Sequence, residues 1–145
     1  MSRADDRLAA ALVAEHAAIF GYGLVGARLD AATVPLAQQA EAAHRSRRDA
    51  VVMRLTGRGA KVPAADPAYG LPAPVTDQAS ALRLAVMIEE RTAASWRAAL
   101  LDTNGDDRRI AVDALVDCAV RATRLRRAAG VSPATVTFPG RIESS

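Results

Sequence analysis

The residues of this sequence best suited to chemistry are a glutamate and a histidine three positions apart, Glu41 and His44. In an α-helix, side chains three positions apart lie on the same face, with Cβ atoms roughly 5–6 Å apart. A carboxylate and an imidazole at this separation can bind one metal ion, and the pair suits iron, manganese or zinc. The spacing therefore predicts Glu41 and His44 as ligands of a metal centre.

Two further glutamates occupy helical stripes of apolar residues. Glu15 falls in a stripe with Leu8, Leu12 and Ile19, and Glu89 falls in one with Leu82 and Trp96. An unpaired buried carboxylate is destabilising by several kcal/mol, roughly, so such residues are usually paired or bound to a metal. We expect Glu15 and Glu89 to complete or bridge the metal centre. Glu90 leaves the register open, because a shift of one residue would turn Glu89 to solvent.

Arg48 offers a way to balance these carboxylates without a metal. It follows His44 by one helical turn in the stripe Ala37, Glu41, His44, Arg48, Val51 and Leu55. Its guanidinium would neutralise one of the three glutamates, and one divalent ion would neutralise the other two. We therefore expect one metal ion, or none, in preference to two.

The elements that must position these residues are four amphipathic segments. Apolar residues recur at helical spacing over residues 4–29, 35–56, 77–101 and 107–129. Pro35 suits the first turn of the second helix, and Gly130 ends the fourth. Residues 61–77 are rich in proline and have no usable period, so they form a long connection. The pattern predicts an all-α antiparallel four-helix bundle over residues 1–130, with residues 131–145 as an irregular tail.

The order of these features resembles the ferritin-like superfamily over about residues 5–127. That order is Glu15 on the first helix, Glu41 and His44 on the second, a long crossover, and Glu89 on the third. The stretches AEHAAIFGYG, HRSRRD and LPAPVTDQASA resemble an uncharacterised actinobacterial branch of that superfamily. The resemblance implies a carboxylate-bridged di-iron or related site with ferroxidase, oxygen-activating or peroxide chemistry. It also implies that Tyr22 lies beside the metal, as a tyrosine does in ferritins.

The fourth helix departs from the pattern of rubrerythrin-type members, because it has no second Glu-x-x-His. Asp113 and Asp117 fall opposite its apolar stripe, where Asp117 can pair with Arg121 at i,i+4. This departure puts a symmetric two-metal site in doubt.

Composition excludes some classes of protein. The chain has 145 residues, is 50% hydrophobic and only 3% aromatic, and carries a net charge of +3, which suits one helical domain with a core of small side chains. Its arginines are interleaved with acids and lack an aromatic platform, so a nucleic-acid partner is not indicated.

The single cysteine, Cys118, excludes an internal disulfide and fits a reducing compartment. Without an evident signal peptide or a run of about 18 apolar residues, we expect a cytoplasmic protein with no membrane partner. A homodimer is the expected assembly.

Two hypotheses on function follow, and they leave open whether the chain is an enzyme and on what substrate. The first is a ferritin-like metalloprotein with oxidoreductase or ferroxidase-type chemistry. It would use iron or manganese bound by Glu15, Glu41, His44 and Glu89, with Tyr22 and Arg48 around them. The second is a metal-free ferritin-like structural or protein-interaction module in which Arg48 neutralises the inner carboxylates.

Three glycines of the first helix, Gly21, Gly23 and Gly26, predict close approach of this helix to a neighbouring helix or a second subunit.

Overall fold

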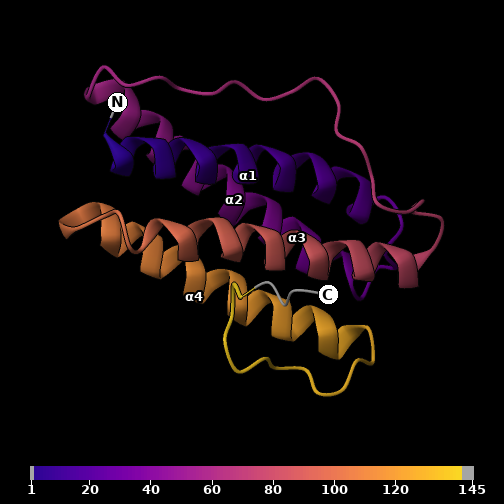
Figure 1. Cartoon of the computed structure of the whole chain (residues 1–145). Coiled ribbons are helices and arrows are strands. Elements are labelled where there is room, and N and C mark those ends of the chain that lie inside the picture. The colour runs from indigo at the N-terminus through magenta and orange to yellow at the C-terminus, as the bar shows by residue number, and fades with distance from the viewer. Residues whose placement is uncertain (1, 142–145) are drawn as a thin grey trace.

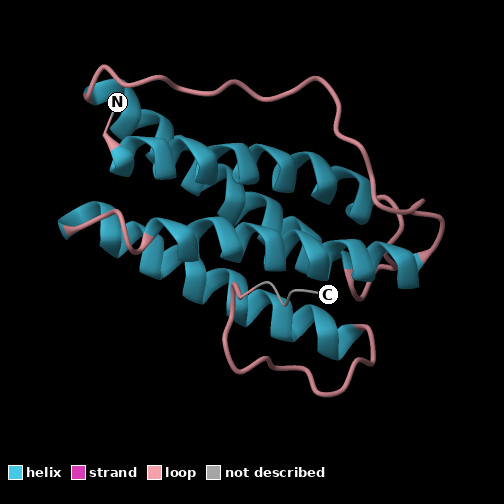
Figure 2. Ribbon diagram, viewed as in Figure 1, coloured by secondary structure: helices cyan, strands magenta, loops and turns pink. Residues whose placement is uncertain are grey.

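The structure is a computed structural model that describes residues 2–141, and it is a bundle of four helices (Figures 1 and 2). The helices are α1 (Arg3–Gly26), α2 (Val34–Gly57), α3 (Gln78–Ala99) and α4 (Gly105–Ala128). Residues 2–141 contain no β-strand. The predicted all-α fold is therefore confirmed, and each helix begins and ends within three residues of its predicted range.

Local sequence signals explain several of the helix ends. Asp77 is the N-cap of α3 and forms a capping box with Ser80. The Asp77 side chain accepts a hydrogen bond from the Ser80 backbone N–H, and the Ser80 hydroxyl oxygen accepts one from the Asp77 backbone N–H. Pro35 lies in the first turn of α2, where its missing N–H has no intrahelical partner to lose. Gly130 follows α4 with a φ of 73°, a conformation that favours glycine.

The connection between α2 and α3 sets the directions of the helices. Figure 1 shows it running the length of the bundle on the side of α1, so that α3 starts at the end opposite to where α2 finishes. As a result α2 and α3 run in the same direction, and α1 and α4 run in the other. α1 packs against both α2 and α3, and α3 packs against α4, whereas α2 and α4 make little contact.

Gly21 shows how closely α1 approaches α3. A Cβ atom built on Gly21 would lie 2.5 Å from Cδ1 of Ile88, so glycine leaves space for the Ile88 side chain. Gly23 has no such neighbour within 4 Å, and the nearest for Gly26 is the Ala37 Cβ at 3.9 Å. The predicted close approach of a neighbouring helix is therefore confirmed at Gly21, whereas at Gly23 no residue of this chain lies close and the approach of a second subunit stays a prediction.

The apolar core consists of two clusters separated along the bundle. One is built around Tyr22, Val25, Leu82, Ile88 and Leu125. The other is built around Leu8, Leu12, Val51, Leu55 and Trp96. Fully buried polar side chains, those of Glu15, His44 and Glu89, belong to neither cluster.

The segment after α4 returns to the bundle without forming a helix. Arg126 Nη1 donates a hydrogen bond to the Ala134 carbonyl oxygen, and Gly140 lies against the backbone of Ala93. The last four residues of the predicted tail, 142–145, lie outside the described residues.

α1 has the length and apolar composition of a candidate membrane span, the only such helix in the described part of the chain. However, 56% of its most apolar window is buried inside the bundle, as expected for a core helix. This feature is weak support for a membrane segment.

Candidate functional site

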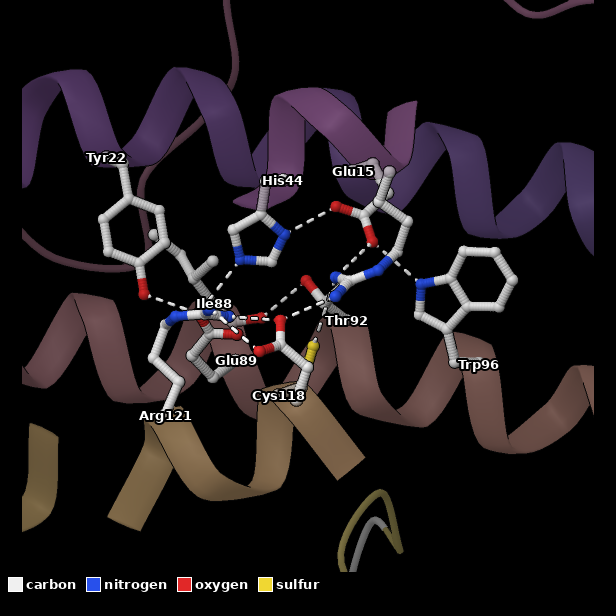
Figure 3. Close-up of polar contacts among 11 residues, drawn as sticks. Glu15, Tyr22, His44, Ile88, Glu89, Thr92, Trp96, Cys118 and Arg121 are labelled. Carbon is white, nitrogen blue, oxygen red and sulfur yellow. Dashed lines mark hydrogen bonds and ion pairs between the residues drawn. The ribbon is translucent and has the colours of Figure 1, made fainter. Parts of the chain in front are cut away.

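The centre of the bundle holds a histidine between two glutamates, each from a different helix (Figure 3). His44 of α2 donates from Nδ1 to Oε2 of Glu15 in α1 at 2.5 Å. Its Nε2 donates to Oε1 of Glu89 in α3 at 2.9 Å. All three side chains are 0% exposed. Three of the four predicted metal ligands therefore meet at one level of the bundle, and they bond to one another.

Each glutamate has further donors around it. Oε1 of Glu15 accepts hydrogen bonds from Trp96 Nε1 at 2.8 Å and from Arg47 Nη1 at 3.1 Å. The Tyr22 hydroxyl donates to Oε1 of Glu89 at 2.8 Å, and its ring stacks on the His44 ring with centroids 5.6 Å apart. Tyr22 therefore contacts two of the predicted ligands, Glu89 and His44, and its place beside a metal stays a prediction.

Two arginines reach the centre from its edge, joined by one aspartate. Arg47 Nη2 lies 2.6 Å from Asp117 Oδ2, and Arg121 binds both Asp117 oxygens at 2.8 and 3.0 Å. Arg121 Nη1 also lies 3.4 Å from Oε1 of Glu89. The i,i+4 pair predicted between Asp117 and Arg121 is confirmed.

The protonation states follow from these contacts. Burial alone would lower the pKa of His44, but the hydrogen bonds to Glu15 and Glu89 outweigh it and raise the pKa to about 9. Burial alone would raise the pKa of Glu15, but the His44 hydrogen bond and the charges of His44 and Arg47 leave it lowered. The centre thus brings three basic side chains, those of His44, Arg47 and Arg121, against three acidic ones, those of Glu15, Glu89 and Asp117.

The remaining two predicted residues lie outside this centre. Glu41 has a side chain that is 30% exposed and pairs with Arg45 at 2.7 Å. Arg48 pairs with its neighbour Asp49 at 2.8 Å. The buried face of α2 is Ala37, Ala40, His44, Val51 and Leu55, with Arg47 at its edge. The predicted stripe steps four residues from Ala37 to Glu41 and four from His44 to Arg48. The observed face steps only three residues from each starting point, so Ala40 and Arg47 replace Glu41 and Arg48.

The structure also shows which of the neighbouring glutamates, Glu89 or Glu90, faces the interior of the bundle. Glu89 is buried at the centre, and Glu90 is exposed and pairs with Arg126 at 2.8 Å. Sequence reasoning missed Arg47 and Arg121 as partners of the buried glutamates. The signal for Arg47 was present, because position 47 follows His44 by three residues and fits the same helical face.

Comparison with known proteins places the chain in a family. Residues 7–143 match a domain of unknown function, DUF4439. The chain belongs to the DUF4439 family. This DUF4439 chain is also similar to a solved structure, that of the conserved hypothetical protein rv2844 from Mycobacterium tuberculosis. The two are 43% identical, the match covers 94% of this chain and 97% of that one, and the TM-score is 0.84. No curated protein matches the chain.

Most of the potential ligand atoms of the DUF4439 centre are hydrogen-bonded to other protein groups. Both His44 nitrogens, both Glu15 oxygens and Oε1 of Glu89 are already hydrogen-bonded within the protein. Only Oε2 of Glu89 is buried without a hydrogen-bond partner among the described residues. Across residues 2–141, no three His, Cys, Asp or Glu side chains are arranged to hold a metal ion. Iron or manganese would therefore have to displace existing partners.

Cys118 lies beside the centre on α4. Its Sγ lies 3.9 Å from Arg47 Nη1. Burial, together with the negative charge of Glu89, raises the pKa of its thiol well above the usual value. Cys118 is therefore a neutral, buried thiol at physiological pH, unsuited to nucleophilic chemistry.

Proposed function

We propose that this DUF4439 protein is a metal-free ferritin-like bundle that acts as a structural or binding module and not as an oxidoreductase. The observation that carries the proposal is the charge balance of the buried centre. Its three carboxylates are paired with one imidazolium and two guanidinium groups. A divalent ion would add positive charge to a centre that is already neutral.

The geometry of His44 argues against acid–base catalysis at this centre. A general base needs a free lone pair within reach of the proton that it abstracts. Both ring nitrogens of His44 donate to carboxylates, and the pKa of about 9 keeps the ring protonated at neutral pH. The ring is also 0% exposed, so a substrate has no direct path to it.

The ferritin-like assignment rests on the arrangement of the helices. A long α2–α3 crossover that leaves these two helices running in the same direction is a feature of ferritin-like bundles (Figure 1). In this proposal the superfamily's metal-binding layer is replaced by a layer of ion pairs. Arg47 and Arg121 take the neutralising role that the sequence suggested for Arg48.

A ferroxidase-type metalloprotein is the second candidate, because Glu15, His44 and Glu89 converge from three helices. Metal binding would require His44 to lose at least one ring proton and to turn away from one carboxylate. The two candidates therefore differ in whether metal binds the folded protein.

The test is metal binding by chelator-treated protein. Fe²⁺ under anaerobic conditions, Mn²⁺ and Zn²⁺ would each be added, with bound metal measured by elemental analysis and stability by thermal unfolding. A ligand that binds only the native state stabilises it by about 2.7 kcal/mol at 100 times its Kd. We expect no bound equivalent and no shift in Tm. One equivalent of metal that binds wild type and Glu41→Ala but not His44→Ala would overturn the proposal.

A further inference from the structure

A cavity that borders the three-residue centre at Glu89 lies between α3, α4 and the returning tail. Its volume is about 880 Å³, and it is lined by α3 from Met87 to Ala93, by α4 from Cys118 to Arg126, and by residues 135–141. Small-molecule sites usually measure roughly 300–1,000 Å³. In Figure 1 the tail leaves the end of α4 as a wide loop and comes back towards the helices, which forms the outer wall.

The tail is fixed at both ends of this wall. At one end, Arg126 Nη1 donates to the Ala134 carbonyl oxygen at 3.2 Å. At the other end, Gly140 has a φ of 79°, and a Cβ there would lie 2.8 Å from the Ala93 carbonyl oxygen. Residues 135–139 therefore form an arch between two anchored points, which keeps the cavity open beneath it.

The walls of the cavity are mainly apolar. The helices contribute Met87, Ala119 and Ala122, and the arch contributes Val136, Phe138 and Pro139. Although they face this space, Val136 and Phe138 remain 49% and 57% exposed. A ligand with an apolar body would remove this surface from water, which is favourable.

The charged side chains that line the cavity leave an excess of positive charge. Arg126 is neutralised by Glu90, and Glu89 is neutralised within the central cluster by His44 and Arg121. Arg91 and Arg141 remain, both exposed, and neither forms an ion pair with any described residue. The Arg141 guanidinium lies 5.8 Å from the centroid of the Phe138 ring, which places a cation directly against the apolar wall.

We propose that this cavity binds a small amphipathic organic anion. The carboxylate or sulfonate head would lie at Arg91 and Arg141, and the apolar body would lie between α3, α4 and the arch. Arginine suits such a head group because its planar guanidinium binds carboxylate or sulfonate oxygens in pairs. This site goes beyond the metal-free function, because the head-group contacts at Arg91 and Arg141 and the apolar wall are formed by residues outside the buried centre.

The first experiment tests binding and charge preference with full-length protein. The probe is 8-anilinonaphthalene-1-sulfonate, an aromatic anion whose fluorescence rises in apolar surroundings. We expect saturable binding at one site, displacement by decanoate, and little displacement by decyltrimethylammonium at equal concentration. Absence of saturable binding would overturn the site, and equal displacement by the cation would overturn the assignment to anions.

The second experiment locates the site with matched variants. Ala119→Phe places a large side chain inside the cavity, and Val116→Phe places the same side chain on an exposed position of the same helix, outside the cavity. We expect Ala119→Phe to weaken decanoate binding at least tenfold and Val116→Phe to leave it unchanged, with wild-type circular dichroism in both. Equal affinities in the two variants would show that the anion binds elsewhere and would overturn the proposal.

The third experiment tests the head-group contact. The double variant Arg91→Gln with Arg141→Gln changes only exposed side chains, so the fold is expected to persist. Loss of a charge-assisted hydrogen bond corresponds to about a tenfold loss of affinity or more. We expect decanoate to bind at least tenfold more weakly, with decanol binding unchanged. A double variant that binds decanoate as tightly as wild type would overturn the role of these arginines.

Discussion

Arg47 of α2 reaches across to Asp117 of α4, with 2.6 Å between Nη2 and Oδ2, although these two helices otherwise make little contact. The same guanidinium donates from Nη1 to the buried Glu15 of α1. Arg47 therefore ties three helices together at the level of the central histidine. A second link between α2 and α4 exists where Arg54 and Arg58 both pair with Asp107.

Replacing Arg47 with methionine is expected to destabilise the protein strongly. The apolar stem is kept, but Glu15 and Asp117 lose a cation, and breaking a buried ion pair costs about 3–5 kcal/mol. Urea unfolding monitored by circular dichroism measures the loss. Arg48→Met is the matched control, because Arg48 pairs with an exposed aspartate and such pairs contribute about 1 kcal/mol or less. Similar losses in the two variants would contradict the neutralising role of Arg47.

The stability of the protein is expected to fall as pH rises from about 6.5 to 9. His44 has a folded-state pKa of about 9 against an ordinary value of 6.5, so the folded state holds this proton more tightly than the unfolded chain. Its stabilisation is complete below the unfolded pKa and is lost as pH rises through the folded pKa. The loss is of the order of 3 kcal/mol. Free energies of unfolding measured across this range check the prediction.

His44→Gln is the control for that titration. Glutamine can still donate one hydrogen bond but has no proton to lose, so the variant should be less stable than wild type at pH 6. Its free energy of unfolding should vary less between pH 6.5 and 9. A wild-type curve that stays flat over this interval would show that His44 is not held as an imidazolium.

The sequence was sufficient to predict the four helices because their apolar residues recur over about twenty positions each. It was also sufficient for Glu15, His44 and Glu89, since polar residues inside such stripes turn inward with them. It was not sufficient to predict that Glu41 and Arg48 lie outside the buried face of α2. Steps of three and four in either order follow a helical face, and a shift of one residue rotates a side chain by about 100°.

The partners of the buried glutamates were harder to predict than the glutamates themselves. Arg121 was placed by its i,i+4 relation to Asp117, but its reach to Glu89 on another helix depends on how α3 packs against α4. Trp96 was predicted as a core residue, and the direction of its indole N–H towards Glu15 depends on a rotamer. Contacts between helices are fixed by packing, which a single stripe does not encode.

Replacing Tyr22 with phenylalanine is expected to destabilise the protein by about 1.5–3 kcal/mol, the usual contribution of a hydrogen bond to a charged group. The change removes the donor to Oε1 of Glu89 and keeps the ring that stacks on His44. Tyr69→Phe is the control, because the Tyr69 hydroxyl only accepts a bond from the exposed Asp66 backbone N–H. Chemical unfolding of both variants gives the comparison. Equal effects at the two positions would mean that the Tyr22 hydroxyl contributes no more than a surface one.

Alanine at Gly21 and at Gly23 should act in opposite directions, although both glycines lie in the same helix. At Gly23 nothing lies within 4 Å of the new methyl group, so the gain in helix propensity should stabilise the protein by about 0.5–1 kcal/mol. At Gly21 the methyl group would lie 2.5 Å from Ile88 Cδ1, and the side chain of Ile88 would have to move within a packed core. Overpacking of this kind costs about 1–3 kcal/mol, which exceeds the gain in propensity. Thermal unfolding of the two variants measures the difference. If Gly21→Ala were as stable as Gly23→Ala, the close approach of α1 to α3 would not constrain this position.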